Sequence, residues 1–287
     1  MFRSLLLLAL TQGIFALPAA EPSCPIVFDG RVPKDASLTD FDANNGGGWM
    51  PFNPGYVKGE TLKWSEILKL PEVAEASRFD SDSGTVPLEV TLSDKSIFMT
   101  QNGFRRAGLQ FLKDSNEGSP ASKGKKTIHF SLRTDPQRAL NLTHEYILVW
   151  HETAAYDANQ FNFQTGTILG QTGLPRDTYK LLDRNNKQLW STPIKSDTWQ
   201  NFGITVDYTG NTLQVWYSEG DEELAKATDP INNNNAGEGQ YQVGMLKKPT
   251  GTSDVVNSGY QESGLDEGLI YGGIFIEDSS ADTCVSK

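Results

Sequence analysis

Apolar and polar residues alternate along much of the chain, a pattern that predicts β-strands with one buried face. Leu88, Val90 and Leu92, for example, are separated by polar residues. Tyr208-Thr209-Gly210-Asn211 predicts a tight hairpin turn between two such segments. The strands expected on this basis are 88–93, 127–133, 145–152, 160–164, 202–208, 212–217, 242–246 and 271–276.

Helical periodicity is confined to residues 60–76. Trp64, Ile67 and Leu68 have helical spacing there, but Pro71 interrupts the segment and limits the helix to about two turns. Long polar loops separate the strands, and no repeat or linker divides the chain. We therefore predict an all-β fold: a single-domain β-jelly-roll or sandwich of two antiparallel sheets, with long loops and at most short helices.

The N-terminal segment has the features of a secretory signal peptide. Arg3 gives it a positive start, a broken apolar stretch too short to span a bilayer follows, and small residues up to Ala20 offer cleavage sites. We assign residues 1–20 to the signal peptide and residues 21–287 to one mature domain. No later apolar run approaches the ~20 residues that a membrane span needs. The protein is therefore expected to be secreted and extracellular.

Two cysteines, Cys24 and Cys284, lie near the two ends of the mature chain. In an oxidising compartment an isolated pair usually forms a disulfide, whereas a reactive thiol would need a neighbouring base that neither residue has in the sequence. A Cys24–Cys284 disulfide also implies that the two ends meet in space, as they do when the first and last strands are neighbours.

The formal net charge of the chain is −11, which argues against binding to nucleic acid or to anionic membranes. No glycine-rich loop precedes a helix to hold phosphate, no Cys/His spacing forms a zinc site, and Gly-x-Ser-x-Gly is absent. We expect a monomer with no metal and no cofactor.

The three histidines, His129, His144 and His151, lie close together in the sequence. On the strand expected here, strict alternation places Glu145 and His151 on one face and Glu152 on the other. A carboxylate and imidazoles on one strand suit general acid–base chemistry, because burial and neighbouring groups can bring their pKa values towards neutrality. A structural hydrogen-bonded pair is the alternative. A metal site from His144, His151 and Glu152 has no recognised ligand spacing.

The chain is rich in aromatic and amide side chains, the two kinds that a sugar-binding groove combines. Trp49 follows a glycine-rich loop and is the candidate for a platform at the lip of such a groove. Asn141-Leu142-Thr143 is an N-glycosylation sequon, so Asn141 is a candidate glycan attachment site. The tryptophans expected to pack in the core or at strand edges are Trp190, Trp199 and Trp216.

A set of short segments spread over the mature chain has a characteristic order and spacing. The segments are Ile26-Val27-Phe28-Asp29-Gly30-Arg31, Phe104-Arg105-Arg106-Ala107-Gly108-Leu109, His129-Phe130-Ser131-Leu132, Thr143-His144-Glu145 with Glu152, Asp197-Thr198-Trp199-Gln200-Asn201-Phe202, Val243-Gly244-Met245-Leu246 and Gly272-Gly273-Ile274-Phe275-Ile276-Glu277-Asp278. Together they resemble glycoside hydrolase family 131, fungal secreted β-glucanases with a β-jelly-roll fold. The resemblance implies β-1,3/β-1,4-glucan degradation on an open groove, with a β-glucan polysaccharide or oligosaccharide as the partner.

The family's proposed catalytic residues are two glutamates. The resemblance places one at Glu145, as acid or base, but the other, after the paired arginines, is Gly108 in this chain. A histidine that the family has before Val-Gly is Gln242 here. Because glycoside hydrolysis usually needs two carboxyl groups, this chain either recruits another carboxylate, such as Glu152 or Asp157, or binds glucan without cutting it.

The remaining polar residues complete the expected site. Arg106 and His144 would orient the substrate or tune the acid. Three functions compete: β-glucan hydrolysis, glucan binding without cleavage, and a polysaccharide lyase reaction in which His144, Tyr146 and Arg106 would act on a uronate. The residues assigned to substrate binding are Trp49, Arg106, His129, His144, His151 and Gln242.

Overall fold

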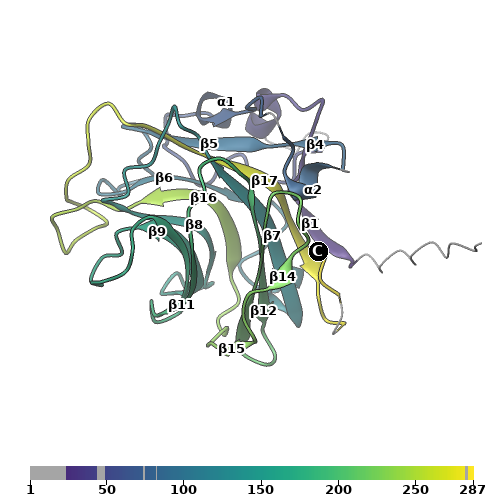
Figure 1. Cartoon of the computed structure of the whole chain (residues 1–287). Coiled ribbons are helices and arrows are strands. Elements are labelled where there is room, and N and C mark those ends of the chain that lie inside the picture. Colours follow the sequence, from purple (N-terminus) through teal and green to yellow (C-terminus); the bar gives the residue numbers. More distant parts are fainter. Residues whose placement is uncertain (1–23, 44–48, 74, 82, 282–283) are drawn as a thin grey trace, which may run out of the picture.

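The computed structural model describes residues 24–43, 49–73, 75–81, 83–281 and 284–287, so the predicted signal peptide lies outside the described residues. Two antiparallel sheets are stacked on one another (Figure 1). The larger sheet has the order β14-β13-β12-β7-β17-β5-β3, with β1 added beside β17 and β15 beside β13. The smaller sheet has the order β11-β10-β9-β8-β16-β6.

The strands of the larger sheet are β1 (Ile26–Asp29), β3 (Leu68–Lys69), β5 (Leu88–Ser93), β7 (Lys125–Thr134), β12 (Gln200–Asp207), β13 (Thr212–Glu219), β14 (Ala225–Lys226), β15 (Ile231–Asn232) and β17 (Asp266–Asp278). Those of the smaller sheet are β6 (Arg105–Gln110), β8 (Glu145–Glu152), β9 (Asn159–Gly166), β10 (Thr178–Asp183), β11 (Gln188–Pro193) and β16 (Gln240–Lys247). The short elements are β2 (Val32–Pro33), β4 (Thr85–Val86), α1 (Trp64–Ile67), α2 (Arg78–Ser81), η1 (Leu38–Asp42) and η2 (Pro120–Ser122).

The predicted all-β fold of two antiparallel sheets is confirmed, and the described helices are as short as expected. Each of the eight predicted strands corresponds to an observed strand, and the predicted turn joins β12 to β13. The pattern missed β6, β10 and β11, together with the shorter strands β1, β2, β3, β4, β14 and β15. No helix within the described part of the chain is long and apolar enough to cross a membrane.

The core lies between the two sheets. Alternate residues of β5, β7 and β12 face residues of β8, β9 and β16 across it. Phe130 of β7 and Phe202 of β12 pack on Phe163 of β9, with ring centroids 5.1 and 4.8 Å away. Each buried ring of this kind contributes about 2–3 kcal/mol of transfer free energy. This burial determines which face of each strand points into the core.

The two ends of the described chain meet at the larger sheet. Cys24 and Cys284 form the predicted disulfide, with their Cα atoms 5.4 Å apart. The neighbouring strand β1 pairs with β17, the last strand in the sequence. Both the disulfide and the expected pairing of the first and last strands are confirmed.

A β-bulge in β8 changes the two faces that strict alternation predicts. Ile147 pairs with Gln164 of β9, but Val149 pairs with the preceding residue, Phe163, so Leu148 is an extra residue. Leu148 and Val149 therefore both face the core. The predicted faces are wrong beyond this point, because a bulge reverses the alternation of the residues that follow it.

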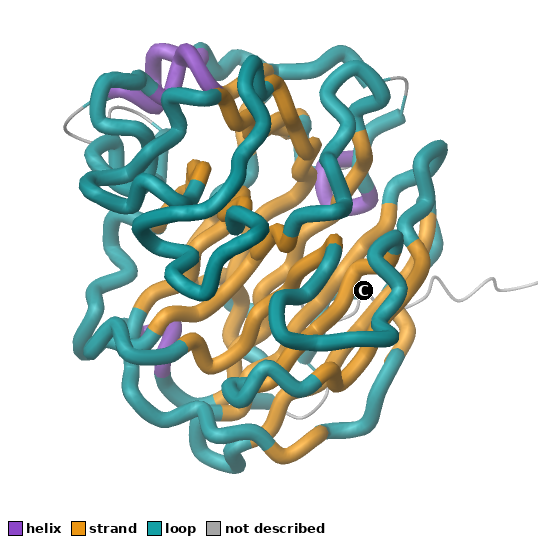
Figure 2. The backbone as a smooth tube through the Cα atoms, turned by 90° about the vertical axis from the view of Figure 1, so that its left-hand side faces the viewer, coloured by secondary structure: helices purple, strands orange, loops and turns teal. Residues whose placement is uncertain are grey.

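The bulge places one set of residues on the outer face of the smaller sheet and another set on its inner face. Ile147 and Trp150 pack together on the outer face, next to Glu152. His151 lies on the inner face, where its ring contacts that of Tyr241 at 4.4 Å. Viewed from the side of the smaller sheet, long loops lie in front of the strands (Figure 2).

Candidate active site

A cleft with a volume of about 600 Å³ lies on the outer face of the smaller sheet. Its floor consists of β6, β16 and β8, and its walls come from the loop between η1 and α1, the loop between β5 and β6, and the loop after β8. Amide and aromatic side chains predominate among the lining residues. These are Asn53, Tyr56, Val57, Phe98, Met99, Gln101, Arg106, Gln110, Glu152, Tyr156, Gln240 and Gln242.

The antiparallel register of the three floor strands brings the polar residues together. Gln242 of β16 pairs with Gln110 of β6 on one side and with Trp150 of β8 on the other. Gln240 pairs with Glu152. Since alternate residues of a strand point to the same face, Gln240 and Gln242 both lie on the floor of the cleft.

A relay of hydrogen bonds crosses this floor. Arg106 donates through Nη2 to Oε1 of Gln242 at 3.2 Å, and Gln242 donates through Nε2 to Oε2 of Glu152 at 2.7 Å. Arg106 also donates through Nη1 to Oε1 of Gln101. The amide of Gln242 is therefore oriented by an arginine on one side and a carboxylate on the other.

Burial shifts the pKa values of the groups at both ends of the relay. Burial raises the pKa of Glu152, an effect that Arg106 and Gln242 partly offset. Burial lowers the pKa of Arg106 to about 10, so that its guanidinium remains charged at neutral pH. Arg106 lies 5.6 Å from the ring centre of Phe98 and 5.8 Å from that of Trp150, which stabilises the cation. A carboxyl group with a raised pKa can hold a proton for transfer to a substrate.

Gly108 lies beside this relay but adds no functional group to it. A Cβ atom at this position would be 3.1 Å from Oε1 of Gln242 and 3.2 Å from Cη2 of Trp150. The indole of Trp150 therefore occupies the space into which a side chain at residue 108 would extend. Of the described residues that line the cleft, Glu152 is the only carboxylate.

Glu145 lies at the opposite end of β8 and does not line the cleft. It is buried, with an ion pair to Lys248 at 2.5 Å and a hydrogen bond from the backbone N–H of Leu169. It lies seven positions before Glu152, roughly 20 Å along a strand. Paired carboxyl groups of glycosidases lie roughly 5–9.5 Å apart. Glu145 and Glu152 therefore cannot act as one pair in this structure.

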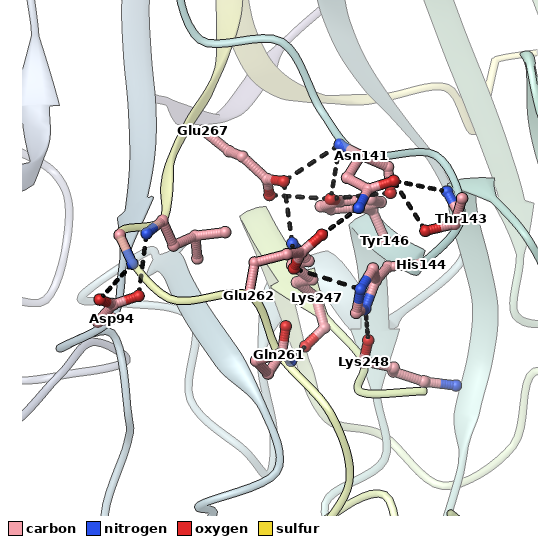
Figure 3. A network of polar contacts seen from close by, with 12 residues as sticks. Asp94, Asn141, Thr143, His144, Tyr146, Lys247, Lys248, Gln261, Glu262 and Glu267 are labelled. Carbon is pink, nitrogen blue, oxygen red and sulfur yellow. Dashed lines mark hydrogen bonds and ion pairs between the residues drawn. The ribbon is translucent and has the colours of Figure 1, made fainter. Parts of the chain in front are cut away.

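His144 does not line the cleft and belongs to a separate polar network (Figure 3). Its Nδ1 donates to the carbonyl of Lys248 at 2.8 Å, and its Nε2 lies 3.3 Å from a carboxylate oxygen of Glu262. At the centre, buried Lys247 bonds to Glu262 at 2.7 Å and to Glu267 at 2.9 Å. The other members are Asn141, which donates to Glu262, and Tyr146, which donates to Glu267. The side chain of the predicted glycan attachment site, Asn141, is thus engaged in this network.

The other two histidines also lie away from the cleft. His129 is on the larger sheet, where it forms a buried pair with Glu277 at 2.8 Å and stacks on Phe275. His151 faces the core, donates to Oε1 of Gln160 and is 3.3 Å from the hydroxyl of Ser122. The structure therefore does not bring either residue to the cleft, and in β8 the bulge turns His151 to the face opposite to the one that strict alternation predicts.

Metal binding by the histidines finds no support in the geometry. His144 lies just before β8 and His151 near its far end, each with partners of its own, and neither lines the cleft with Glu152, so the three side chains considered in the sequence do not converge. Among the described residues, no group of three or more His, Cys, Asp or Glu side chains is placed to bind an ion.

Trp49 is a packing residue in this structure and does not line the cleft. Its indole donates to Asp40 at 3.1 Å and contacts the edge of Phe41. The expected packing roles of the other tryptophans are confirmed: Trp199 and Trp216 are buried, and Trp190 packs against the core.

Sequence reasoning missed most of the cleft walls. Tyr56, Phe98, Met99 and Tyr156 lie in loops, where no periodicity marks a shared surface. Gln110 could have been found from the sequence, because it lies four residues after Arg106 on β6 and so points to the same face. Two of the predicted binding residues, Arg106 and Gln242, do lie in the cleft together with Glu152.

Comparison with known proteins agrees with this architecture. No curated protein matches the chain. A GH131 β-glucanase catalytic domain from Podospora anserina has a similar structure, with a TM-score of 0.70 and 22% identity over 88% of this chain and 96% of that one. The catalytic domain of the glycoside hydrolase family 131 protein from Coprinopsis cinerea gives a TM-score of 0.69 and 21% identity, over 92% of this chain and 98% of that one.

The sequence match extends over most of the chain. The family described as "Glycoside hydrolase 131 catalytic N-terminal domain" matches residues 26–282, from β1 to beyond the end of β17. This range includes both sheets and all described residues of the cleft. The chain therefore belongs to glycoside hydrolase family 131.

Proposed function

We propose that this protein hydrolyses β-glucans in the cleft and that Glu152, not Glu145, is its general acid. One observation carries the proposal: a carboxyl group with a burial-raised pKa opens into a cleft lined by amide and aromatic side chains. Such a lining suits a polymer of neutral sugars, whose hydroxyls bond to amides and whose rings stack on aromatic faces. The activity named for the Podospora anserina relative, a β-glucanase, supports the same substrate class.

The cleft supplies one half of a glycosidase mechanism. Glu152 would give its proton to the glycosidic oxygen as the bond from that oxygen to C1 breaks, and water would add to C1. The proton lost by the water would return to the Glu152 carboxylate. Gln242 orients the Glu152 carboxyl group, and Arg106 holds Gln242. With no second carboxyl group among the described lining residues, we expect slow turnover, because general base assistance typically contributes about 10²–10⁴-fold.

Glucan binding without cleavage is the second candidate, and a specific observation favours it. Gly108 provides no carboxyl group, and the Trp150 indole fills the space beside it. A cleft of this kind could still bind a sugar chain through its amides and aromatic rings. No observation favours a lyase, because Tyr146 donates to Glu267 on the core side and His144 lies outside the cleft.

Product release from β-1,3-, β-1,4- and mixed-linkage glucans, measured beside a pull-down on the same insoluble polymers, separates the two candidates. Glu152→Gln is the test variant, because glutamine can still accept the hydrogen bond from Gln242 but cannot donate a proton as an acid. Glu145→Gln is the matched control on the same strand. Oligosaccharide release that Glu152→Gln abolishes and Glu145→Gln retains is the expected result.

Other outcomes of this experiment lead to different conclusions. Binding to the polymers without any release would establish the second candidate function. Release that depends on Glu145 and not on Glu152 would contradict the assignment of the acid. Absence of both release and binding would reject a β-glucan ligand.

The remaining expectations are part of the same proposal. We infer that residues 1–20 direct secretion and are removed, and that residues 21–287 act as one extracellular domain with β-1,3/β-1,4 specificity. The Cys24–Cys284 disulfide supports an oxidising destination. Mass spectrometry of the secreted protein would test the cleavage site and the occupancy of Asn141 together.

A further inference from the structure

Two large side chains at the mouth of the cleft adopt a backbone conformation that such residues rarely take. Tyr156 has φ +57° and Met99 has φ +51°, both in the left-handed region. The other described non-glycine residues in this region are Asn186, Asn211 and Glu238. For a bulky side chain this conformation is unfavourable, and it persists where the surrounding structure imposes it, often at functional sites.

The left-handed conformation of Tyr156 presents its ring to solvent. Two-thirds of the residue is exposed, although it lines the cleft four residues after Glu152. An exposed ring loses the burial energy that usually justifies an aromatic residue, so packing within the protein does not explain Tyr156.

The loop that carries Tyr156 is held by a dense set of hydrogen bonds. Thr153 Oγ1 donates to Asp157 and accepts from the backbone N–H of Ala158, and the N–H of Tyr156 bonds to the carbonyl of Thr153. From a separate loop, Asn116 donates to the hydroxyl of Tyr156. The ring is therefore fixed in position before any ligand binds, which reduces the entropy lost on binding.

A second exposed tyrosine lies on the other side of the cleft. Tyr56 precedes Val57, which exchanges two backbone hydrogen bonds of 3.0 and 2.8 Å with Gly108. These bonds lie along the free edge of β6, the end strand of the smaller sheet. Tyr156 lies in the loop after β8, and β16 separates β6 from β8. Tyr56 contacts the ring of Phe98 edge-on and is half exposed. The floor relay therefore lies between two aromatic lips.

We propose that Tyr156, opposite Tyr56, is a saccharide-stacking platform that selects pyranose rings with all their hydroxyls equatorial. This inference rests on the proposed function and specifies the sugar that the cleft accepts. A β-glucosyl residue presents C–H groups on both ring faces, so it can contact aromatic rings on either side. An axial hydroxyl, as in a β-mannosyl residue, places a polar group against one of the two lips.

Calorimetric titration with cellohexaose, laminarihexaose and β-1,4-mannohexaose tests the platform. Tyr156→Ala is expected to weaken binding of both glucohexaoses about tenfold, the loss typical of an aromatic contact residue, and to reduce the preference for cellohexaose over mannohexaose. Tyr260→Ala is the matched control, because Tyr260 is equally exposed but does not line the cleft. It should leave all affinities unchanged.

A second variant distinguishes a binding role from a structural one. Tyr156→Gly removes the ring and the strain of the left-handed conformation together, so we expect weaker glucan binding without a lower melting temperature. A clear fall in melting temperature would show that the ring is structural and would overturn the inference. So would unchanged glucohexaose affinity in Tyr156→Ala, which would leave the proposed function standing. If the wild-type protein binds no glucan, both the proposed function and the platform are rejected.

Discussion

A buried carboxyl group and a buried imidazole give opposite contributions to the pH dependence of stability. Asp114 accepts hydrogen bonds from the Ser119 hydroxyl and the Tyr241 N–H, but burial dominates and raises its pKa to about 6. Burial lowers the pKa of His151 to about 4, although its hydrogen bond to Gln160 opposes this change. Both side chains are fully buried, and both contact Tyr241.

The two signs follow from proton binding in the folded and unfolded states. Asp114 has an ordinary pKa of 3.8, so the folded protein keeps the Asp114 proton up to a higher pH than the unfolded chain does. The resulting contribution to stability is complete below pH 3.8 and is lost as the pH rises through about 6. His151 has an ordinary pKa of 6.5, so its contribution is present above 6.5 and is lost as the pH falls through about 4. One pKa unit corresponds to about 1.4 kcal/mol. Each residue therefore changes the free energy of unfolding by about 3 kcal/mol, in opposite directions, over nearly the same pH range.

Urea unfolding at a series of pH values between those limits measures the two contributions separately. His151→Asn keeps a donor for Gln160 and should make stability fall, relative to wild type, by about 3 kcal/mol from about pH 4 to 6. Asp114→Asn should make stability rise by a similar amount over the same range. Comparison with wild type removes the contributions of all other titrating groups. If the difference between either variant and wild type were independent of pH, the assigned protonation of that residue would be wrong.

Two further predictions concern the cleft and the disulfide. Gly108→Glu, combined with Trp150→Ala to clear the space that the indole occupies, should raise hydrolysis of β-glucan at least 10-fold over Trp150→Ala alone if a second carboxyl group is what the cleft lacks. Gly108→Gln in the same background is the control of equal size, and equal effects of both would argue against acid–base catalysis. Reduction of Cys24–Cys284, which closes a loop of 260 residues, should lower stability by up to about 5 kcal/mol in the chain-entropy treatment. An unchanged melting temperature after complete reduction, verified by thiol titration, would contradict that contribution.

The fold was predictable because the core depends on patterns that the sequence shows directly. Leu88, Val90 and Leu92 alternate with other residues on β5 and face the core as expected. β10 was missed because its alternation is short: Tyr179, Lys180 and Leu181 alternate, but Leu182 follows Leu181 directly. The pattern would also leave Lys180 exposed, whereas it is fully buried. Lys180 lies there by bonding to the carbonyls of Gly166 and Thr178, contacts that no local pattern reveals.

The site was only partly predictable, because it depends on one irregular residue and on loops. Arg106 and Gln242 were identified from the family resemblance, and the antiparallel register joins them across β6 and β16. The bulge at Leu148 could not be inferred, since both Leu148 and Val149 are apolar and either residue could have continued the alternation. The aromatic lips come from residues 100 positions apart in the chain, Tyr56 and Tyr156, which only the folded structure brings to one cleft.

The bulge decides which carboxylate can serve the cleft. Glu145 and Glu152 have opposite parity, so a regular strand would place them on opposite faces, and the extra residue at Leu148 brings both to the outer face. They nevertheless remain at opposite ends of β8, and only Glu152 reaches the relay with Arg106. The same bulge turns Trp150 outward against Gly108. Its indole then occupies the space that a carboxyl side chain at residue 108 would need. Family membership follows from a match over residues 26–282, whereas the proposed hydrolysis would depend on a few side chains around residue 108. The fold is therefore shared with the family, and the proposed catalysis has to be tested in this chain through Glu152 itself.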